Sequence, residues 1–462
     1  MPHDDYAIRL IRTLGHSGKP VFLSEYGIGS QVDAIRVTKR FQQAGASPKL
    51  EDAALYRAMA DAYTTDWNRF GMNQLYAFPE DMLEESQRLN AERRIRGFDW
   101  IRANPRLCGY NLTGTVDQVM AGEGLWTTWR ELKPGMMDAL TDGWAPLRWC
   151  LIVNRTHVYR GRPFLFELHL ANEGVLAPGI YPVKIRLSGP EGVVWERSFD
   201  WEMTDAGAEA FALPVWQEEM VVHGAPGAYQ FTAAMERGGS PAGGKLALTL
   251  SEEVAPLTDP VVVSLWGVDR KAEDWLRSRN VDCRSYDPGA TDIPDIVLVG
   301  DPGDDPSWER HWERLFSFVR KGTRVAFLEP LGLFGADGTS SKLPFEHKGK
   351  AVRYANTLYH KEDVAKPHAF FDGMPTGGIM SWDYYDQIIP EYVLEDMEQP
   401  DETVVASFAV GYPCPGGYFG GIVLGDYRLG EGRIIVNALK ITDNIDKNPA
   451  ADRLLLNMAR SL

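Results

Sequence analysis

Apolar residues recur with three different periods along this chain, and each period predicts a different kind of segment. Up to about residue 147 most of them lie at helical spacing. Between about 149 and 253 they occupy alternate positions of short runs, as in strands with one buried face. From about 255 compact apolar runs alternate with amphipathic helices, which favours a parallel sheet. The pattern therefore predicts a multidomain α/β plus β fold with domains at residues 1–147, 148–254 and 255–462.

Helices dominate the first of these domains. Asp5 to Leu14 has a helical apolar face, and a long helix begins at Pro79, a residue favoured in the first turn, with acidic residues behind it. The apolar face of the long helix consists of Leu83, Leu89, Ile95, Phe98 and Ile101. We interpret its basic stretch of Arg93, Arg94 and Arg96 as a solvated face.

The middle domain reads as a run of short strands separated by Gly, Pro and Asn turns. The predicted strands are Cys150–Val153, Phe164–Leu170, Tyr181–Leu187, Val193–Phe199, Tyr229–Met235 and Leu246–Leu250. Strands at this spacing favour an immunoglobulin-like β-sandwich. No catalytic constellation is visible in it, and we interpret it as a structural or carbohydrate-binding module.

The last domain reads as a doubly wound sheet with a second, β-rich half. Predicted strands at Val261–Leu265, Ile296–Val299 and Val325–Leu328 alternate with helices, one of them at Trp308–Val319. The nearest approach to a metal-ligand cluster is the set His360, Glu362, Asp363 and His368. We interpret these charges as a solvated loop and expect no metal site.

Candidate chemistry concentrates in Lys19 to Gln31, which reads K-P-V-F-L-S-E-Y-G-I-G-S-Q. The apolar run from Val21 to Leu23 predicts a parallel strand buried on both faces. Glu25 follows the run, at the end of the strand where a (β/α)8 barrel places its catalytic groups. A carboxylate there can attack an anomeric carbon. Alternatively, Glu25 caps the next segment or pairs with a neighbouring arginine.

The run K-P-V-F-L-S-E-Y-G resembles the strand-seven segment of family two glycoside hydrolases, the group of β-galactosidases, β-glucuronidases and β-mannosidases. Leu107 to Lys133 is similar to strand eight and its long loop. The resemblance covers most of the chain and implies that residues 1–147 are the last two strands of a (β/α)8 barrel. Carried over to this sequence, it implies that Glu25 is the nucleophile of a retaining β-glycosidase.

Two further residues are candidates for binding a carbohydrate substrate. Asn111 and Thr113 fall at the carboxyl end of the second predicted strand, on the same side as Glu25. Asn111 could hydrogen-bond a sugar hydroxyl or cap the loop. Trp126 and Trp129 follow in the loop, where one ring could stack on the substrate or both could pack beneath the loop. For Trp129 we favour packing.

The sequence departs from the family pattern before Glu25. A (β/α)8 barrel needs about 250 residues, but only 24 residues precede Glu25. The family's acid/base, a Glu after an Asn at the end of strand four, has no counterpart here. The chain therefore looks like the C-terminal part of a larger enzyme, and we expect weak or no hydrolysis by it alone.

The last domain resembles the class I glutamine amidotransferase-like fold that some β-galactosidases append. Phe371 to Pro375, Trp382 to Tyr385 and Gly430 to Asn437 carry this resemblance. An active amidotransferase needs a cysteine at a sharp turn after a buried strand, whereas Glu329-Pro follows the strand here. The resemblance thus implies a non-catalytic domain that serves assembly or shape.

Composition narrows the function classes. The chain has 462 residues and a net charge of −16, which argues against nucleic acid as a partner. It has no long apolar run and begins without a signal-peptide pattern, so we expect no membrane span and no signal peptide. The four cysteines lie in or beside apolar runs, so we expect buried free thiols. No G-x-G-x-x-G follows the first strand of the last domain, and we expect no cofactor.

A second function remains open at this point. In it the chain is a non-catalytic carbohydrate-binding or assembly protein. Two predicted barrel strands leave strand edges unpaired, which favours association, either as a homo-oligomer or with a complementing N-terminal polypeptide. The sequence identifies neither the sugar, galactose, glucuronic acid or mannose, nor the compartment.

Overall fold

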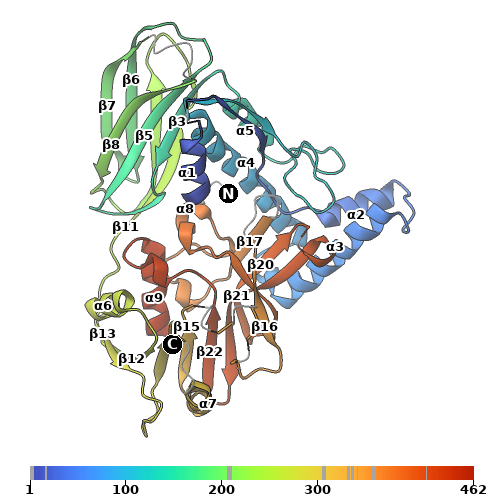
Figure 1. Ribbon diagram of the computed structural model, residues 1–462, viewed down its shortest axis with the longest axis vertical. Helices are drawn as coiled ribbons and strands as arrows, with labels where there is room; N and C mark the ends of the chain where they lie inside the picture. The colour runs from blue at the N-terminus through green and yellow to red at the C-terminus, as the bar shows by residue number, and fades with distance from the viewer. Residues whose placement is uncertain are drawn as a thin grey trace.

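The computed structural model divides the chain into a helical N-terminal region, a two-sheet region and a C-terminal region built on one large sheet (Figure 1). It describes residues 5–15, 18–204, 211–303, 308–329, 333–334, 338–340, 342–354, 360–412 and 414–462. Within these residues the fold is mixed α/β with large sheets and contains no closed barrel.

In its described residues the N-terminal region combines five α-helices with one small sheet. Its elements are α1 (Asp5–Thr13), β1 (Val21–Tyr26), α2 (Ala34–Gln43), α3 (Glu51–Arg69), α4 (Pro79–Arg102), β2 (Leu107–Leu112) and α5 (Met136–Gly143). Strands β1 and β2 pair in parallel, with Val21 opposite Leu107 and Tyr26 opposite Leu112. Two neighbouring parallel strands are what the sequence predicts here.

The small sheet packs on α4 by aromatic contacts. The ring of Phe98 lies 6.1 Å from that of Tyr26 in β1 and 5.8 Å from that of Tyr110 in β2. The opposite side of β1 is open, and Phe22 is 57% exposed. The prediction that Val21 to Leu23 is buried on both faces was therefore wrong for Phe22, because no described segment covers that side.

The middle region is a two-layer β-sandwich. Its strands are β3 (Leu147–Val153), β4 (His157–Tyr159), β5 (Pro163–Asn172), β6 (Gly179–Gly189), β7 (Gly192–Met203), β8 (Ala212–Val221), β9 (Gly227–Met235), β10 (Ala242–Gly243) and β11 (Lys245–Ser251). They form sheets in the orders β10-β3-β5-β8 and β4-β11-β9-β6-β7. Alternating side chains of β5 fill the space between the sheets, where Phe166 stacks on Phe231 with ring centroids 4.1 Å apart.

The C-terminal region is built on an 11-stranded sheet. Its strands are β12 (Val261–Trp266), β13 (Val281–Ser285), β14 (Ile296–Val299), β15 (Arg324–Phe327), β16 (Lys348–Arg353), β17 (His360–Ala365), β18 (Gly378–Ile379), β19 (Tyr392–Met397), β20 (Glu402–Val410), β21 (Tyr418–Leu429) and β22 (Gly432–Asn437). Its helices are α6 (Arg270–Ser278), α7 (Trp308–Val319), α8 (Trp382–Tyr385) and α9 (Pro449–Ser461).

The two halves of this sheet have different topologies. Strands β13-β12-β14-β15-β22 are parallel, and β22-β21-β20-β17-β18 continue the sheet in antiparallel order. The parallel half follows the predicted alternation of strands and helices. Of the cysteines, Cys150, Cys283 and Cys414 are buried free thiols, but Cys108 is exposed on the open sheet, so the prediction of burial was wrong there.

The N-terminal helices share a hydrophobic core with the large sheet. The ring of Tyr63 in α3 lies 5.6 Å from Phe408 of β20 and 5.9 Å from Tyr418 of β21. Figure 1 shows α3 beside these strands, while α4 runs from there towards the sandwich. Helix α3 is thus anchored on the C-terminal sheet.

Candidate functional site

Glu25 and Asn111 meet at the carboxyl ends of the paired strands. Both line a hollow of about 430 Å³ together with Ser24, Thr113, Thr115 and Gln118. The parallel pairing of β1 with β2 produces this neighbourhood, because it aligns the ends of the two strands at one edge. The backbone N–H of Thr113 donates to the carbonyl of Tyr26 at 3.0 Å and extends the alignment past the strands.

The carboxylate of Glu25 is exposed and unpaired. Across the described part of the chain it makes neither a hydrogen bond nor an ion pair. The alternative interpretation, in which Glu25 caps a segment or pairs with an arginine, therefore finds no contact to support it. The oxygen atoms of Glu25 are free to contact a molecule that enters the hollow.

The loop after β2 is fixed to the segment after β1 by a buried ion pair. Lys133 donates to Asp117 at 2.7 Å, to Ser30 Oγ at 2.9 Å and to the carbonyl of Gly122 at 2.8 Å. Lys133 and Asp117 are both buried, and so is Ser30. This buried, hydrogen-bonded pair thus ties the loop that supplies Thr115 and Gln118 to the segment after β1.

The two tryptophans of this loop have different environments. Trp129 packs edge-on against Phe41 of α2, with ring centroids 5.2 Å apart, in agreement with the packing role that we favour. Trp126 is half-buried against the apolar cluster of Phe98 and Met136. It is not among the residues that line the hollow around Glu25. A stacking role for Trp126 stays a prediction.

Sequence reasoning missed a buried ionic cluster between α4 and the C-terminal sheet. Arg93 donates to both oxygens of Glu362, at 2.9 and 3.0 Å. The same carboxylate accepts from Ser86 at 2.7 Å and lies 2.6 Å from His360 Nε2. Trp382 of α8 stacks on the Arg93 guanidinium at 3.9 Å. Burial opposes the ionisation of Glu362, but the charge of Arg93 and the hydrogen bonds from His360 and Arg93 lower its pKa overall.

Two interpretations of the sequence were therefore wrong. Arg93 and Arg94 are buried rather than solvated, and His360, Glu362 and Asp363 lie in the buried strand β17 rather than in a loop. The partners Arg93 and Glu362 are 269 residues apart, so no local pattern could reveal the pair. Among the residues that the structure describes, no group of three or more His, Cys, Asp or Glu is placed to hold a metal ion.

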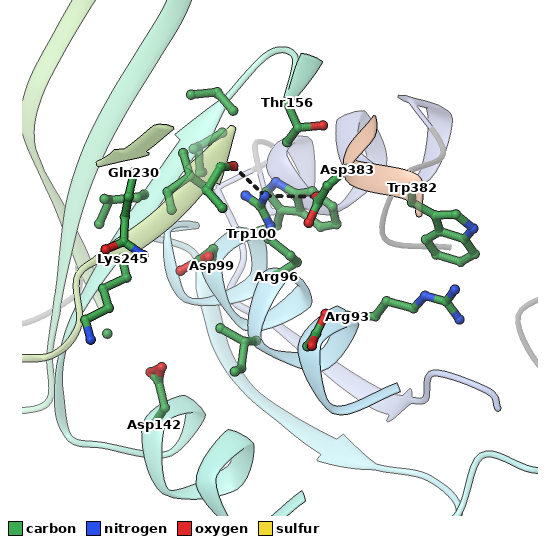
Figure 2. Close-up of a pocket in the computed structure, with 18 of the residues that line it drawn as sticks. Arg93, Arg96, Asp99, Trp100, Asp142, Thr156, Gln230, Lys245, Trp382 and Asp383 are labelled. Atoms are coloured by element: carbon green, nitrogen blue, oxygen red, sulfur yellow. Dashed lines mark hydrogen bonds and ion pairs between the residues drawn. The ribbon is translucent and has the colours of Figure 1, made fainter. Parts of the chain in front are cut away.

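A larger cavity of about 730 Å³ lies where the three regions meet (Figure 2). Arg96 of α4 donates to Asp383 of α8 at 3.0 Å and to the carbonyl of Ala247 in β11 at 3.2 Å. At the wall of this cavity Arg148 donates to Asp99 and Asp142, at 2.7 Å each. These paired charges link α4 to α8 and to the sandwich strands β3 and β11 around the cavity.

Comparisons with known proteins place the chain in no family. No family model matches it, and no curated protein matches it. Helices of the length and apolar composition needed to cross a bilayer do not occur in the described ranges.

Three solved structures with local similarity show how weak the likeness is. The exo-β-1,4-mannosidase Op5Man5 from Opitutaceae bacterium strain TAV5 is 8% identical over 44% of this chain and 36% of its own, with a TM-score of 0.26. The alkylpurine DNA glycosylase AlkC of Pseudomonas fluorescens, bound to DNA containing an abasic site analog, is 17% identical over 25% of this chain and 34% of its own, with a TM-score of 0.18. The CARDB domain of the Pyrococcus furiosus protein PF1109 is 10% identical over 23% of this chain and 88% of its own, with a TM-score of 0.16.

These similarities carry no argument about function. The chain spans about a third of the length of the AlkC and mannosidase structures. The mannosidase is a glycoside hydrolase, but none of the three TM-scores reaches the level of a shared fold.

Proposed function

We propose that the chain carries the nucleophile of a retaining β-glycosidase, and that this nucleophile is Glu25. The observation that supports the proposal is the unpaired carboxylate of Glu25 beside Asn111 at the carboxyl edge of two parallel strands. This is the edge where barrel enzymes place catalytic groups. The resemblance to family two glycoside hydrolases points to the same residue.

In the proposed reaction a Glu25 oxygen attacks the anomeric carbon of a β-glycoside, and the bond to the leaving oxygen breaks. A second carboxylic acid, about 5 Å away, gives its proton to the leaving oxygen. Water then hydrolyses the glycosyl ester, and the second group takes up the proton. In this proposal Asn111, which lines the same hollow, hydrogen-bonds a sugar hydroxyl. The partial-barrel, immunoglobulin-like and amidotransferase-like assignments of the three regions belong to this proposal.

The test uses 2-deoxy-2-fluoro β-glycosyl fluorides with galacto, glucurono and manno configurations. Fluoride departs without being protonated, so the reagent reports on the nucleophile even where the second carboxyl group is missing. We expect one glycosyl adduct on the peptide that contains Glu25, located by peptide mass spectrometry, and none on Glu25→Gln. The matched control is Glu131→Gln, since Glu131 lies in the loop after β2 and pairs with Arg36 and Arg40.

Failure of this test has a defined form. An adduct on another residue, or no adduct with any of the three reagents, would remove the nucleophile assignment and favour a non-catalytic carbohydrate-binding or assembly protein.

A further inference from the structure

A second carboxyl group, that of Glu123, lies close to Glu25 and has no role in the proposed reaction. Its side chain crosses the carboxyl ends of both strands. A β-carbon placed on Gly27, just after β1, would lie 2.7 Å from Glu123 Oε2. A β-carbon placed on Gly114, just after β2, would collide with Cγ of Glu123. Glycine at these positions therefore lets the Glu123 side chain fill the space between the two strand ends.

One polar atom of Glu123 and one of the neighbouring Arg94 are buried without hydrogen-bond partners in the described residues. Glu123 Oε2 and Arg94 Nη1 are both inaccessible to solvent, and neither has a hydrogen-bond partner in the part of the chain that the structure describes. Arg94 is fully buried, and its Nη2 donates to the backbone carbonyl of Glu123 at 2.5 Å. Within the same residues Arg94 forms no ion pair within 4.0 Å. A buried cation without a direct ion pair interacts strongly with any charge nearby.

The charged groups around Glu123 come from three elements. Glu25 faces it from β1, Arg94 from α4, and Asp117 and Lys133 from its own loop. Burial raises the pKa of Glu123, the cation of Arg94 opposes this rise, and the negative charge of Glu25 adds to it. With all five groups charged the cluster holds three negative and two positive charges, so a proton on Glu123 balances it.

We propose that Glu123 is a positioning residue for Glu25, which braces the ends of β1 and β2 and changes the charge beside the nucleophile when it takes up or releases a proton. The catalytic part of this role rests on the proposed function of Glu25. Glu123 does not line the hollow, so it acts through Glu25 and the strand ends rather than through the sugar.

The first arm of the test is independent of any enzymatic activity. Interactions between two titrating groups are reciprocal, so removal of the Glu25 charge must make Glu123 easier to ionise. We expect the titration midpoint of Glu123, followed by carbon-13 NMR of glutamate carboxyl groups in the full chain, to fall in Glu25→Gln. Loss of the signal in Glu123→Gln assigns it. An unchanged midpoint overturns the inference.

The second arm follows the rate at which the fluoro-sugar reagent labels Glu25 as a function of pH. In the wild-type chain we expect an inflection at the Glu123 midpoint, with a change of roughly tenfold if the coupling is about one pKa unit. Glu123→Gln should lose this inflection and Glu123→Asp should keep it. A merely structural role would lower the rate equally at every pH, and that result contradicts the inference.

The two arms separate this inference from the proposed function. If the wild-type chain is not labelled, the nucleophile assignment fails, while the NMR midpoint still decides whether Glu25 and Glu123 are coupled. If the wild-type chain is labelled and its pH profile is the same in Glu123→Gln, the nucleophile assignment stands and the positioning role fails. Should Glu123→Gln fold poorly, the pH profile of labelling in Glu123→Asp tests the positioning role. The Glu123 midpoint in Glu25→Gln tests the coupling.

Discussion

Glu25 in β1 and Glu362 in β17 are both strand glutamates, but the two sheets surround them differently. Glu362 is 1% exposed and bound by Arg93, Ser86 and His360. Glu25 is exposed and has no partner in the described residues. The large sheet is covered by helices and by the N-terminal region, whereas one side of the two-stranded sheet is open.

These two environments distinguish a structural carboxylate from a candidate catalytic one. A carboxylate whose hydrogen-bonding capacity is already used holds its neighbours in place and has nothing left for a ligand. An unpaired carboxylate at the edge of a hollow contributes little to stability and is available for chemistry. The two classes of glutamate should therefore respond in opposite ways to substitution, in stability and in labelling.

The largest expected effect is loss of stability when the Arg93–Glu362 pair is broken. Glu362→Gln leaves the Arg93 guanidinium buried without a counter-charge, which typically costs about 3–5 kcal/mol. The free energy of unfolding from urea titration measures this cost. The matched control is Glu84→Gln on α4, the helix that carries Arg93. Glu84 forms an exposed pair with Arg88 that is worth about 0.3–0.5 kcal/mol.

A double-mutant cycle sharpens this result. If Arg93 and Glu362 act as a pair, Arg93→Met combined with Glu362→Gln should cost clearly less than the sum of the single changes. Additive costs would mean that the two residues stabilise the fold independently. That result would contradict the interpretation of Glu362 as a carboxylate held by its pair with Arg93.

The next effect in size is a pH dependence of stability from His157. Its ring lies 2.8 Å from the carbonyl of Tyr384 and 2.7 Å from Ser251 Oγ, where burial lowers its pKa to about 4. Between this value and the unfolded value near 6.5 the unfolded chain binds more protons, so stability rises with pH in that window. Acidification from pH 7 to pH 4 should cost up to about 3 kcal/mol.

Urea midpoints at pH 7 and pH 4.5 measure this term, and His157→Gln should flatten the difference. Some pH dependence should remain in that variant, because burial lowers the pKa of His360 as well and acts with the same sign. Exposed His223 provides the control substitution. Equal pH dependence in wild type and His157→Gln would contradict the assignment.

Local pattern predicted the elements of the fold much better than their contacts. The six longer strands predicted for the sandwich are confirmed, but β4, β8 and β10 were not predicted. In β8, Pro214 weakens the strand signal. That proline is tolerated because β8 lies at the edge of its sheet. The parallel pairing of β1 with β2 agrees with the resemblance, which implies that these runs are neighbouring strands.

The candidate site was predictable only in part. Glu25 and Asn111 follow apolar runs, and this position signals a strand end. Glu123 carries no such signal, since it lies in an irregular loop and approaches Gly27 only through the fold. The burial of Arg93 depends on Glu362, which is 269 residues away. Contacts of this range are set by tertiary packing and are invisible to local periodicity.

The smallest expected effect on stability is that of Glu25→Gln, and it completes the comparison. Because the Glu25 carboxylate has no partner, its replacement removes no contact, and surface changes of this kind usually stay within about 0.5 kcal/mol. Removal of its charge also relieves repulsion with Glu123, so a small gain in the free energy of unfolding is expected at pH 7. Urea titration measures it beside the labelling assay. A loss above about 1 kcal/mol would reveal a structural role for Glu25. Glu25 would then resemble Glu362, because its substitution would lower stability as well as labelling.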